Sequence, residues 1–543
     1  MNSWGLRLAF LVALWLLLVS AALLFRPLMP VVETRYLAVA WEMWVREDFL
    51  VPHLNGAPYS HKPPLLFWLM QTGWGIFGVN EWWPRLVSPV FGLACIFLVI
   101  AVCRQLWPND PGAATVAPLL LIGGLFWSLY TTLAMFDMLV AAFTLVGLLG
   151  LLRAWRQGEW SGWALVGLAI GVGILTKGPV VLLYIMPAAL LAPWWDTGKA
   201  IGNRINGWVR WYLGLAASIV IGVAIGLAWA GPAMNAGGED YANAILWDQT
   251  AGRIVNAFDH GQPFWWYLVL LPPALLPWIL WPALWRAANG AWRARYDDDD
   301  VTADSGIRFC VVCFALALVV LSLVSSKQPH YLLPIMPAVA LLAARVLSRF
   351  GQPGLRWDAA PLSVLVIALL VIGAYLIASG QFGPQTSFGS VMNLLWVLPV
   401  LAGALWLLCL PKIGPPVIAG LSAVLIASVH GIARPALEQT HSVSGIAAYI
   451  GSLQRAGRLV AHDGKYHGQY HFLGRLEKPL PIVDCDTAPD WLRRNPEGAL
   501  VFYRRRPGDG IQADYDQRFR AKFVGVWSAD KVLAHPEQFV CDQ

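Results

Sequence analysis

The stretch LRLAFLVALWLLLVSAALLF, residues 6–25, decides the class of fold. It holds one charge, Arg7, at its start and then continues for a length that crosses the hydrocarbon core of a bilayer. The run is too long for the apolar core of a signal peptide, and no small-residue cleavage site precedes Arg26. We therefore expect a retained first membrane span.

The composition extends this expectation to most of the chain. Of 543 residues 58% are apolar and 13% are charged, whereas soluble domains carry roughly 25% charged residues. Further runs of spanning length lie at residues 83–103, 113–132, 134–152, 162–176, 178–194, 212–231, 264–285, 308–325, 329–345, 360–379, 391–410 and 415–433. The sequence predicts an all-α polytopic membrane protein with about thirteen transmembrane helices.

One shorter run, residues 63–78, decides the orientation. If it does not cross the membrane, the connections that hold most of the arginines and lysines fall on one side, which the positive-inside rule makes the cytoplasm. We therefore expect the run to be an interfacial or re-entrant helix on the outer face, with Trp68 and Trp74 at headgroup level. The amino end is then cytoplasmic, and residues 26–82 form a long outer loop.

The composition changes after residue 435. Residues 436–543 alternate short apolar stretches at 459–461, 481–483 and 500–502 with an amphipathic stretch at 444–455, which predicts a small α/β domain outside the cytoplasm. A Cys485–Cys541 disulfide is possible there. We interpret His462, Asp463, His467 and His471 as part of a solvated loop. The net charge of +6 is spread singly, so no nucleic-acid partner is expected.

The predicted topology gathers ionisable residues at the outer face. They arrive from several loops or span ends: Glu33, Arg35, His53, His61, Lys62, Asp137, Lys177, Arg253, Asp259, His260, Lys327 and His330. Asp137 is the sharpest single case, because it heads an otherwise apolar helix, where a charge costs about 2.5–3.5 kcal/mol and less near the interface. Its alternative role is to cap the N-terminus of that helix.

The basic members of this set predict an anion site. Lys177 and Lys327 each lie in a polar turn between spans, where a lysine can also simply extend its ammonium to the interface. Gathered with Lys62 and Arg253 around one polar pocket, they supply the several donors and the dispersed positive charge that a phosphate requires.

These residues, in this order, resemble the membrane glycosyltransferases that include bacterial aminoarabinose transferase and the protein mannosyltransferases. The resemblance runs from Pro30 to about Pro337. Its pieces are Glu33-Thr34-Arg35-Tyr36, Val51-Pro52-His53, Lys62-Pro63 with Trp68, Asp137, Thr176-Lys177-Gly178, Arg253, Pro263-Phe264-Trp265-Trp266-Tyr267, and Lys327 with Tyr331. The match rests on the order and spacing of all these pieces.

The resemblance implies a GT-C-type glycosyltransferase fold with an outer-face catalytic cavity. It implies an inverting enzyme of the bacterial inner membrane that transfers a monosaccharide from a polyprenyl (undecaprenyl) phosphate to lipid A, another glycolipid or a protein at the periplasmic face. That family often carries an acidic pair in the first loop, and here Val32 takes the place of the first acid. The base for an acceptor hydroxyl is then Glu33 or Asp137, and a phosphate acceptor needs a base much less.

The roles expected from this reading fall into three groups. The catalytic residues are Glu33, Asp137 and Lys62, and the carrier phosphate is held by Lys62, Arg253 and Lys327. The residues expected to bind substrate are Arg35, Tyr36, His53, Lys177, His260 and Tyr331. No cofactor is required; a divalent metal is conceivable if Glu33, His53, His61, Asp259 and His260 converge, but no metal-ligand spacing is present.

Two other classes of function remain open. A secondary transporter would use the same charges as substrate or proton sites, although such charges usually lie near the bilayer midplane and accompany internal repeats. A flippase would bind polyprenyl phosphate without chemistry, and the loss of the acid at Val32 keeps that alternative in view.

Overall fold

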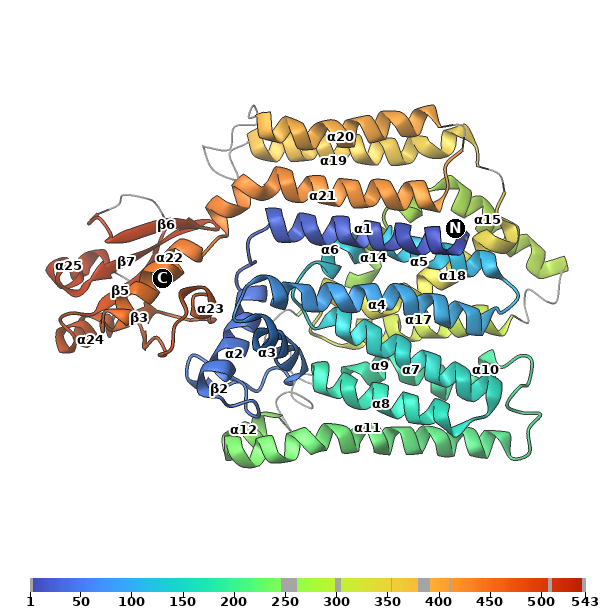
Figure 1. The fold of residues 1–543 in the computed structure, drawn as a ribbon, viewed down its shortest axis with the longest axis horizontal. Coiled ribbons are helices and arrows are strands. Elements are labelled where there is room, and N and C mark those ends of the chain that lie inside the picture. The colour runs from blue at the N-terminus through green and yellow to red at the C-terminus, as the bar shows by residue number, and fades with distance from the viewer. Residues whose placement is uncertain are drawn as a thin grey trace.

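The computed structural model describes residues 3–245, 261–297, 304–352, 354–378, 391–410, 412–505 and 510–539. Long helices lie side by side in a bundle, and a smaller domain of strands and short helices lies at one end of it (Figure 1). The first outer loop, drawn in dark blue, occupies the same end of the bundle between the long helices and that domain. The arrangement is that of a multi-pass membrane protein.

The bundle is built from the helices that precede and follow the outer loop. They are α1 (Ser3–Phe25), α4 (Trp82–Leu106), α5 (Pro111–Ile122), α6 (Leu125–Thr131), α7 (Asp137–Gln157), α8 (Trp160–Lys177), η1 (Gly178–Val181), α9 (Leu182–Leu190), α10 (Ala192–Trp195), α11 (Gly207–Gly237), α12 (Glu239–Asn243), α14 (Trp266–Ala274), η3 (Trp278–Leu280), α15 (Pro282–Asp297), α17 (Ser305–Leu323), η4 (Pro329–Ile335), α18 (Met336–Phe350), η5 (Arg356–Ala359), α19 (Ala360–Ala378), α20 (Val391–Cys409) and α21 (Pro415–Thr440).

The length of these helices tests the expected number of spans. Within the described ranges eight helical stretches are long and apolar enough to cross a membrane, and a ninth is added if α5 and α6, which meet at 65°, form one bent span. The predicted runs at 360–379 and 391–410 coincide with α19 and α20, whose apolar parts are shorter within the described side chains. The fold class is confirmed, and the described residues contain eight or nine of the expected spans in full.

The stretch Trp160–Leu190 passes the length test as one span, but its side chains show a hairpin. Trp163 near the start of α8 and Trp195 at the end of α10 both lie against Trp211, with ring centroids 4.7 and 6.1 Å away. Gly173 of α8 also lies against Val181, because the chain turns back at Gly178, where φ is +75°. The two predicted runs, 162–176 and 178–194, are therefore separate segments of opposite direction, and α9 of the second packs on α7 and α17.

The predicted span at 264–285 is not one helix. It is divided into α14, η3 and the start of α15. Pro272 and Pro273 lie at the end of α14, Pro277 precedes η3 and Pro282 begins α15. Each proline removes a backbone donor and crowds the preceding turn, so a continuous helix cannot form.

The basic loops gather at the end of the bundle that is remote from the outer loop. Arg156 donates to the carbonyls of Gln105 and Leu106, and Arg204 donates to those of Ala154 and Arg156. Arg345 bridges Asp110 and Asp304. The sequence analysis placed the arginine-bearing connections on one side of the membrane, and these contacts agree with that prediction.

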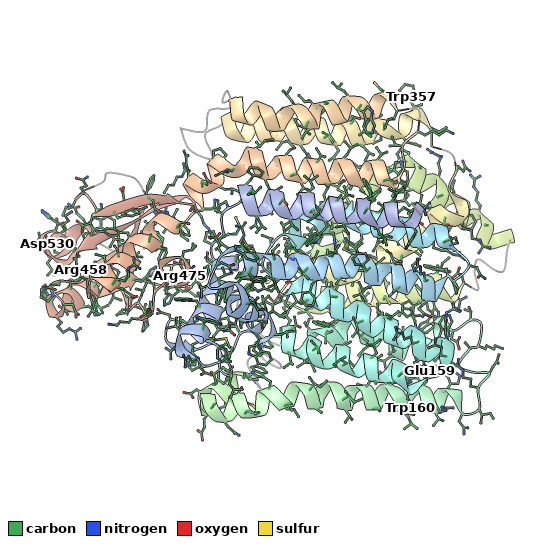
Figure 2. All side chains as sticks on the ribbon, in the orientation of Figure 1. Glu159, Trp160, Trp357, Arg458, Arg475 and Asp530 are labelled. Atoms are coloured by element: carbon green, nitrogen blue, oxygen red, sulfur yellow. The ribbon has the colours of Figure 1, made fainter. Side chains whose placement is uncertain are left out.

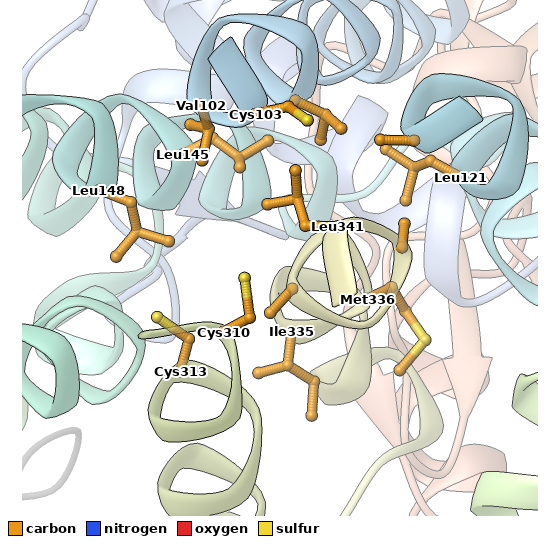
Figure 3. Packing of buried hydrophobic residues seen from close by; sticks show 14 of the residues in the cluster. Val102, Cys103, Leu121, Leu145, Leu148, Cys310, Cys313, Ile335, Met336 and Leu341 are labelled. Atoms are coloured by element: carbon orange, nitrogen blue, oxygen red, sulfur yellow. The ribbon is translucent and has the colours of Figure 1, made fainter. Parts of the chain in front are cut away.

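The core between these helices is apolar and tightly filled. Figure 3 shows Cys310 and Cys313 of α17 pointing into it beside Ile335, with Cys103 and Val102 of α4 across the gap. Both α17 thiols are free and buried, which agrees with their interpretation as small apolar side chains. This core holds the helices that carry Asp137 and Lys177 in fixed register.

The outer loop folds into two helices and a hairpin. They are α2 (Val32–Arg46), β1 (His53–Leu54), β2 (Ala57–Pro58) and α3 (Leu65–Phe77). The predicted interfacial run at 63–78 corresponds to α3, which is too short for the span test and lies at the end of the bundle beside α2 (Figure 1). Trp74 is buried against the domain that follows rather than exposed at a headgroup layer.

The C-terminal domain has the predicted α/β character. Its elements are α22 (Ser444–Arg455), β3 (Val460–Asp463), α23 (His471–Gly474), β4 (Ile482–Val483), α24 (Ala488–Arg494), β5 (Ala499–Arg504), β6 (Tyr515–Phe519), β7 (Lys522–Ser528), α25 (Ala529–Ala534) and η6 (Pro536–Gln538). The sheet order is β4-β3-β5-β7-β6, with β3 parallel to β4 and β5, and β7 antiparallel to β5 and β6. The boundary expected at residue 435 falls inside α21, and Cys485 is disulfide-bonded, while Cys541 lies outside the described residues.

This domain docks on the outer loop through apolar and backbone contacts. Phe472 stacks on Trp74 at 5.3 Å, Trp41 Nε1 donates to the carbonyl of Leu476, and Asn55 exchanges two hydrogen bonds with Leu480. Figure 2 shows Arg475 on the side of the domain that faces the bundle, with Asp530 and Arg458 on the far side. The outer loop is thus enclosed between the bundle and the domain.

Candidate functional site

Asp137 and Lys177 form the centre of the outer end. Asp137 is the first residue of α7, Lys177 is the last of α8, and Lys177 Nζ lies 2.6 Å from Asp137 Oδ1. Both side chains are buried. A carboxylate at a helix N-terminus and an ammonium at a helix C-terminus each match the helix dipole, so the two helix ends and the ion pair stabilise one another.

Further groups surround this ion pair. His330 Nε2 lies 3.9 Å from Asp137 Oδ2, and Lys62 of the outer loop attracts the same carboxylate. Lys177 Nζ lies 4.5 Å from the ring centre of Tyr331, within the range of a cation–π interaction. Within the described ranges three positive or protonatable side chains therefore converge on one carboxylate. The cluster therefore concentrates positive charge at the outer end of the bundle.

Tyrosines line this cluster. Tyr36 of α2 packs its ring edge on Phe136 and interacts electrostatically with Tyr59 and Asp137. Burial, followed by Tyr59 and Asp137, raises the pKa of Tyr36 above its usual value, so the phenol is neutral at physiological pH. Tyr184 donates to the carbonyl of Tyr331, which fixes that ring near Lys177. The tyrosines give the cluster flat apolar faces with polar edges, the surface that suits a sugar ring.

Glu33 lies in a separate, fully enclosed cluster. Arg26 binds both carboxylate oxygens, and the backbone amides of Met29 and Ala134 donate one hydrogen bond to each. Burial raises the pKa of Glu33, but Arg26, then Arg85 and the amide of Ala134, outweigh it and hold the pKa below its usual value. A carboxylate with its oxygens occupied in this way ties α2 to the start of the bundle and is poorly placed to accept a proton from a substrate.

Lys327 lies beside the Asp137 cluster rather than in it. Its ammonium donates to the carbonyls of Gln262 and Val324 at 2.9 and 2.6 Å. The following residue, Gln328, accepts a hydrogen bond from Tyr267, whose ring is close enough to interact with Asp137. An ammonium has three donors, so one donor of Lys327 remains beyond these two carbonyls.

The other predicted residues are placed differently. His53 forms part of the β1–β2 hairpin and pairs its Nδ1 with the Val51 carbonyl, and burial followed by Arg46 lowers its pKa. Arg35 points toward the C-terminal domain, where its Nη2 lies 3.0 Å from His467 Nδ1. Arg253, Asp259 and His260 lie outside the described residues. In the part of the chain that is described, no three His, Cys, Asp or Glu side chains are grouped as metal ligands.

Several residues that shape this end carried no signal in the sequence. Arg26 and Arg85 read as ordinary charges at span ends, yet both are buried around Glu33. Glu42, within α2, accepts hydrogen bonds from the amides of Asn55 and Gly56 and so holds the hairpin. The interpretation of the C-terminal histidines as a solvated loop was wrong for His462 and His471, which are 0% and 1% exposed.

Known proteins are similar to this chain in sequence and in fold. Residues 61–229 match the family described as dolichyl-phosphate-mannose-protein mannosyltransferase. A *Pseudomonas fluorescens* protein named undecaprenyl phosphate-alpha-4-amino-4-deoxy-L-arabinose arabinosyl transferase 2 is 28% identical over 324 residues, 58% of this chain and 55% of that protein. Its *Pseudomonas aeruginosa* counterpart is 29% identical over 327 residues, with the same two shares. The chain thus spans little more than half the length of these curated relatives.

The fold is similar to a solved structure over its whole length. ArnT from *Cupriavidus metallidurans* in the apo state superimposes with a TM-score of 0.70 at 19% identity and covers 100% of both chains. The same protein bound to undecaprenyl phosphate gives a TM-score of 0.69 at 19% identity, covering 96% of this chain and 97% of that one. Similarity at this identity concerns the fold, which is of the GT-C type. The resemblance expected from the motifs is therefore confirmed: the chain is related to the polyprenyl-phosphate-sugar-dependent membrane glycosyltransferases, the group of aminoarabinose transferase and the protein mannosyltransferases.

Proposed function

We propose that the protein is an inverting glycosyltransferase that moves a monosaccharide from undecaprenyl phosphate to a lipid-linked acceptor at the periplasmic face of a bacterial inner membrane. The observation that carries the proposal is the gathering of Lys62, Lys177 and His330 around Asp137, walled by tyrosines, at the end of the bundle where the outer loop closes. The names of the relatives, which concern the same carrier, support it.

The carrier phosphate is assigned to the lysines. Lys62 comes from the outer loop and adds its charge to that of Lys177 beside Asp137, so we assign the phosphate to this cation. As the bond between the anomeric carbon and the phosphate oxygen breaks, the phosphate gains charge, and a fixed ammonium stabilises that charge more than it stabilises the ground state. Lys327 and Arg253 remain candidates for the same phosphate, and the prenyl chain would lie along apolar helix surface.

The roles of the other groups follow from their surroundings. Asp137 and Lys177 form a preorganised pair that positions the sugar, while Tyr36 and Tyr331 offer ring faces and hydroxyls to it. The acceptor oxygen attacks the anomeric carbon as the phosphate leaves from the opposite face, so that one carbon–oxygen bond forms, one breaks, and the configuration inverts.

Whether Glu33 or Asp137 can act as a base decides which kind of acceptor we propose. Glu33 is enclosed by four donors, and Asp137 is committed to Lys177. With Val32 in place of the family's first acid, neither of these two acids is free to deprotonate an alcohol. We therefore assign the acceptor to an oxygen that is already ionised at neutral pH, as in a phosphate of lipid A or another glycolipid, and give a protein hydroxyl second place.

The test is release of free undecaprenyl phosphate by the purified protein from a panel of undecaprenyl-phosphate sugars. Each donor is offered with lipid A, with dephosphorylated glycolipid, and with no acceptor. Release that requires the phosphorylated acceptor supports transfer, and the product lipid identifies the sugar. Carrier binding without release from any donor would favour a flippase and would remove the transferase assignment.

A further inference from the structure

Arg35 is a cation that lacks a counterion. In the described part of the chain it contacts no acid, and its one hydrogen bond is to His467 Nδ1 at 3.0 Å. Its Nε is buried without a partner. A guanidinium carries five N–H donors in a planar fork that matches a phosphate or carboxylate. Most of that binding capacity is therefore unused.

Three other arginines are each paired with acids. Arg26 is paired with Glu33, Arg345 with two aspartates, and Arg286 with both oxygens of Asp358. These pairs brace one element against another and leave little for a ligand. Arg35 is the exception among these four, because a neutral histidine ring, rather than an acid, accepts its hydrogen bond.

Its position joins the site to the C-terminal domain. Arg35 precedes Tyr36 on α2, and the two side chains interact electrostatically, while Tyr36 also faces Asp137. On its other side Arg35 contacts His467, which follows strand β3 of the domain. The guanidinium thus lies between the Asp137 cluster and the domain, at the edge of the proposed sugar position.

The loop that carries His467 is held rigidly. Gly468 has φ of +76°, and a Cβ there would lie 2.5 Å from Leu54 Cδ1 and 3.1 Å from Ala38 Cβ, so the loop packs directly on the hairpin and α2. The side chain of Gln469 accepts from the His467 amide and donates to the Tyr503 hydroxyl. Because Nδ1 accepts from Arg35, the neutral ring carries its proton on Nε2. The loop therefore holds the imidazole in a fixed position against the guanidinium.

We propose that Arg35, positioned by His467, is an anion site for a phosphate of the acceptor, and that the C-terminal domain thereby takes part in acceptor recognition. The inference rests on the proposed transferase function and adds a second anion position to it. The donor phosphate lies at the lysines around Asp137, and a phosphate of the acceptor lies at Arg35. Keeping the two anions on separate cations limits their mutual repulsion while both substrates are bound.

The experiment uses the full chain in nanodiscs, with lipid A carrying two phosphates and with its monophosphoryl form. For Arg35→Gln we expect KM for the bisphosphorylated acceptor to rise about ten- to hundredfold, the loss typical of a hydrogen bond to a charged group. The donor KM should change little, and the preference for the second phosphate should disappear. His467→Ala should change the same parameters by less, whereas His467→Gln, which can still accept a hydrogen bond from Arg35, should restore the preference.

Direct binding separates this inference from the proposed function. Bisphosphorylated lipid A is titrated without donor and followed by tryptophan fluorescence in wild type, Arg35→Gln, His467→Ala and the control Arg493→Gln, whose arginine pairs with Asp490 on the exposed surface of α24. Weaker binding in Arg35→Gln and His467→Ala, but not in Arg493→Gln, supports the site. If these variants bind more weakly but no donor is ever turned over, only the transferase assignment fails. Equal binding in all four proteins overturns the inference. Inorganic phosphate is added at millimolar concentration as a competitor. If it displaces the lipid as effectively as unlabelled lipid does, the site binds a free anion, and the acceptor role is overturned.

Discussion

Lys177 Nζ lies 2.6 Å from Asp137 Oδ1, although the two residues are 40 positions apart and belong to different helices. The contact joins the start of α7 to the end of α8, and these helices pack along their length. A buried ion pair of this kind is sensitive to loss of one partner, because the remaining charge has no solvent to stabilise it. Substitution of either residue is therefore expected to lower stability, so stability must be measured beside activity in each variant.

The Asp137–Lys177 pair should behave as a unit. Lys177→Met should lower the free energy of unfolding by about 3–5 kcal/mol, because the buried Asp137 carboxylate loses its short ion pair and keeps only His330 at 3.9 Å and the charge of Lys62. Asp137→Asn in the same chain should recover part of that loss, since the uncompensated charge disappears. Thermal unfolding of the two single variants and the double variant measures the coupling; simple additivity would show that the pair contributes no interaction energy of its own.

Glu33→Gln should change the stability of the protein more than its catalytic rate. The pKa of Glu33 is lower in the folded protein than the ordinary value of 4.5, so its contribution is present above about pH 4.5 and is lost as the pH falls through the lowered pKa. Wild type should therefore lose stability on acidification more steeply than Glu33→Gln does. Unfolding midpoints between pH 7 and pH 3 test this; parallel curves for the two proteins would contradict the ion-pair role.

Turnover should depend on Lys62 far more than folding does. Lys62→Ala removes a positive charge from the position assigned to the leaving phosphate, and loss of one such group typically lowers kcat about 10²–10³-fold. The unfolding midpoint should stay close to that of wild type. Release of undecaprenyl phosphate under saturating donor measures the effect. The control is Lys531→Ala on α25, which lies at the far end of the C-terminal domain (Figure 1). Full activity of Lys62→Ala would exclude it from the phosphate site.

Valine at Gly468 should weaken the docking of the C-terminal domain on the outer loop, whereas valine at Gly464 should not. Both glycines have positive φ, so valine at either position pays a similar backbone cost, but only at Gly468 does a Cβ meet neighbouring atoms, those of Leu54 and Ala38. We expect Gly468→Val to lose about 1–3 kcal/mol more than Gly464→Val through overpacking. Limited proteolysis of the connection after Thr440 reports the docking; equal cleavage rates in the two variants would place the domain's anchorage elsewhere.

Much of the fold was predictable because its causes are local. Residues 444–455 alternate apolar and polar side chains with helical period, and α22 has those bounds. Asp137 at the head of an apolar run was expected at a helix start, where it lies. The charge count that kept residues 63–78 out of the membrane also agrees with the short helix α3.

The predicted site was incomplete for a reason that is not local. Nothing near Glu33 in the sequence indicates that Arg26 and Arg85 enclose it, because the three side chains meet only when α1, α2 and α4 pack together. Likewise His467 reaches Arg35 from 432 positions away. A prediction from periodicity places residues on a face, but it does not reveal which buried charges satisfy one another and which remain available to a ligand.

The contacts between the outer loop and the C-terminal domain also impose an order on biosynthesis. Arg520 donates to the carbonyl of Pro30 across 490 positions, and His467 completes the surroundings of Arg35. After α2 has been synthesised, the ribosome must still synthesise nearly all the remaining helices, and these must be inserted, before His467 and Arg520 exist. Until then the loop is held only by the bundle, so a half-made chain carries the lysines of the proposed donor site without the surface proposed to recognise the acceptor.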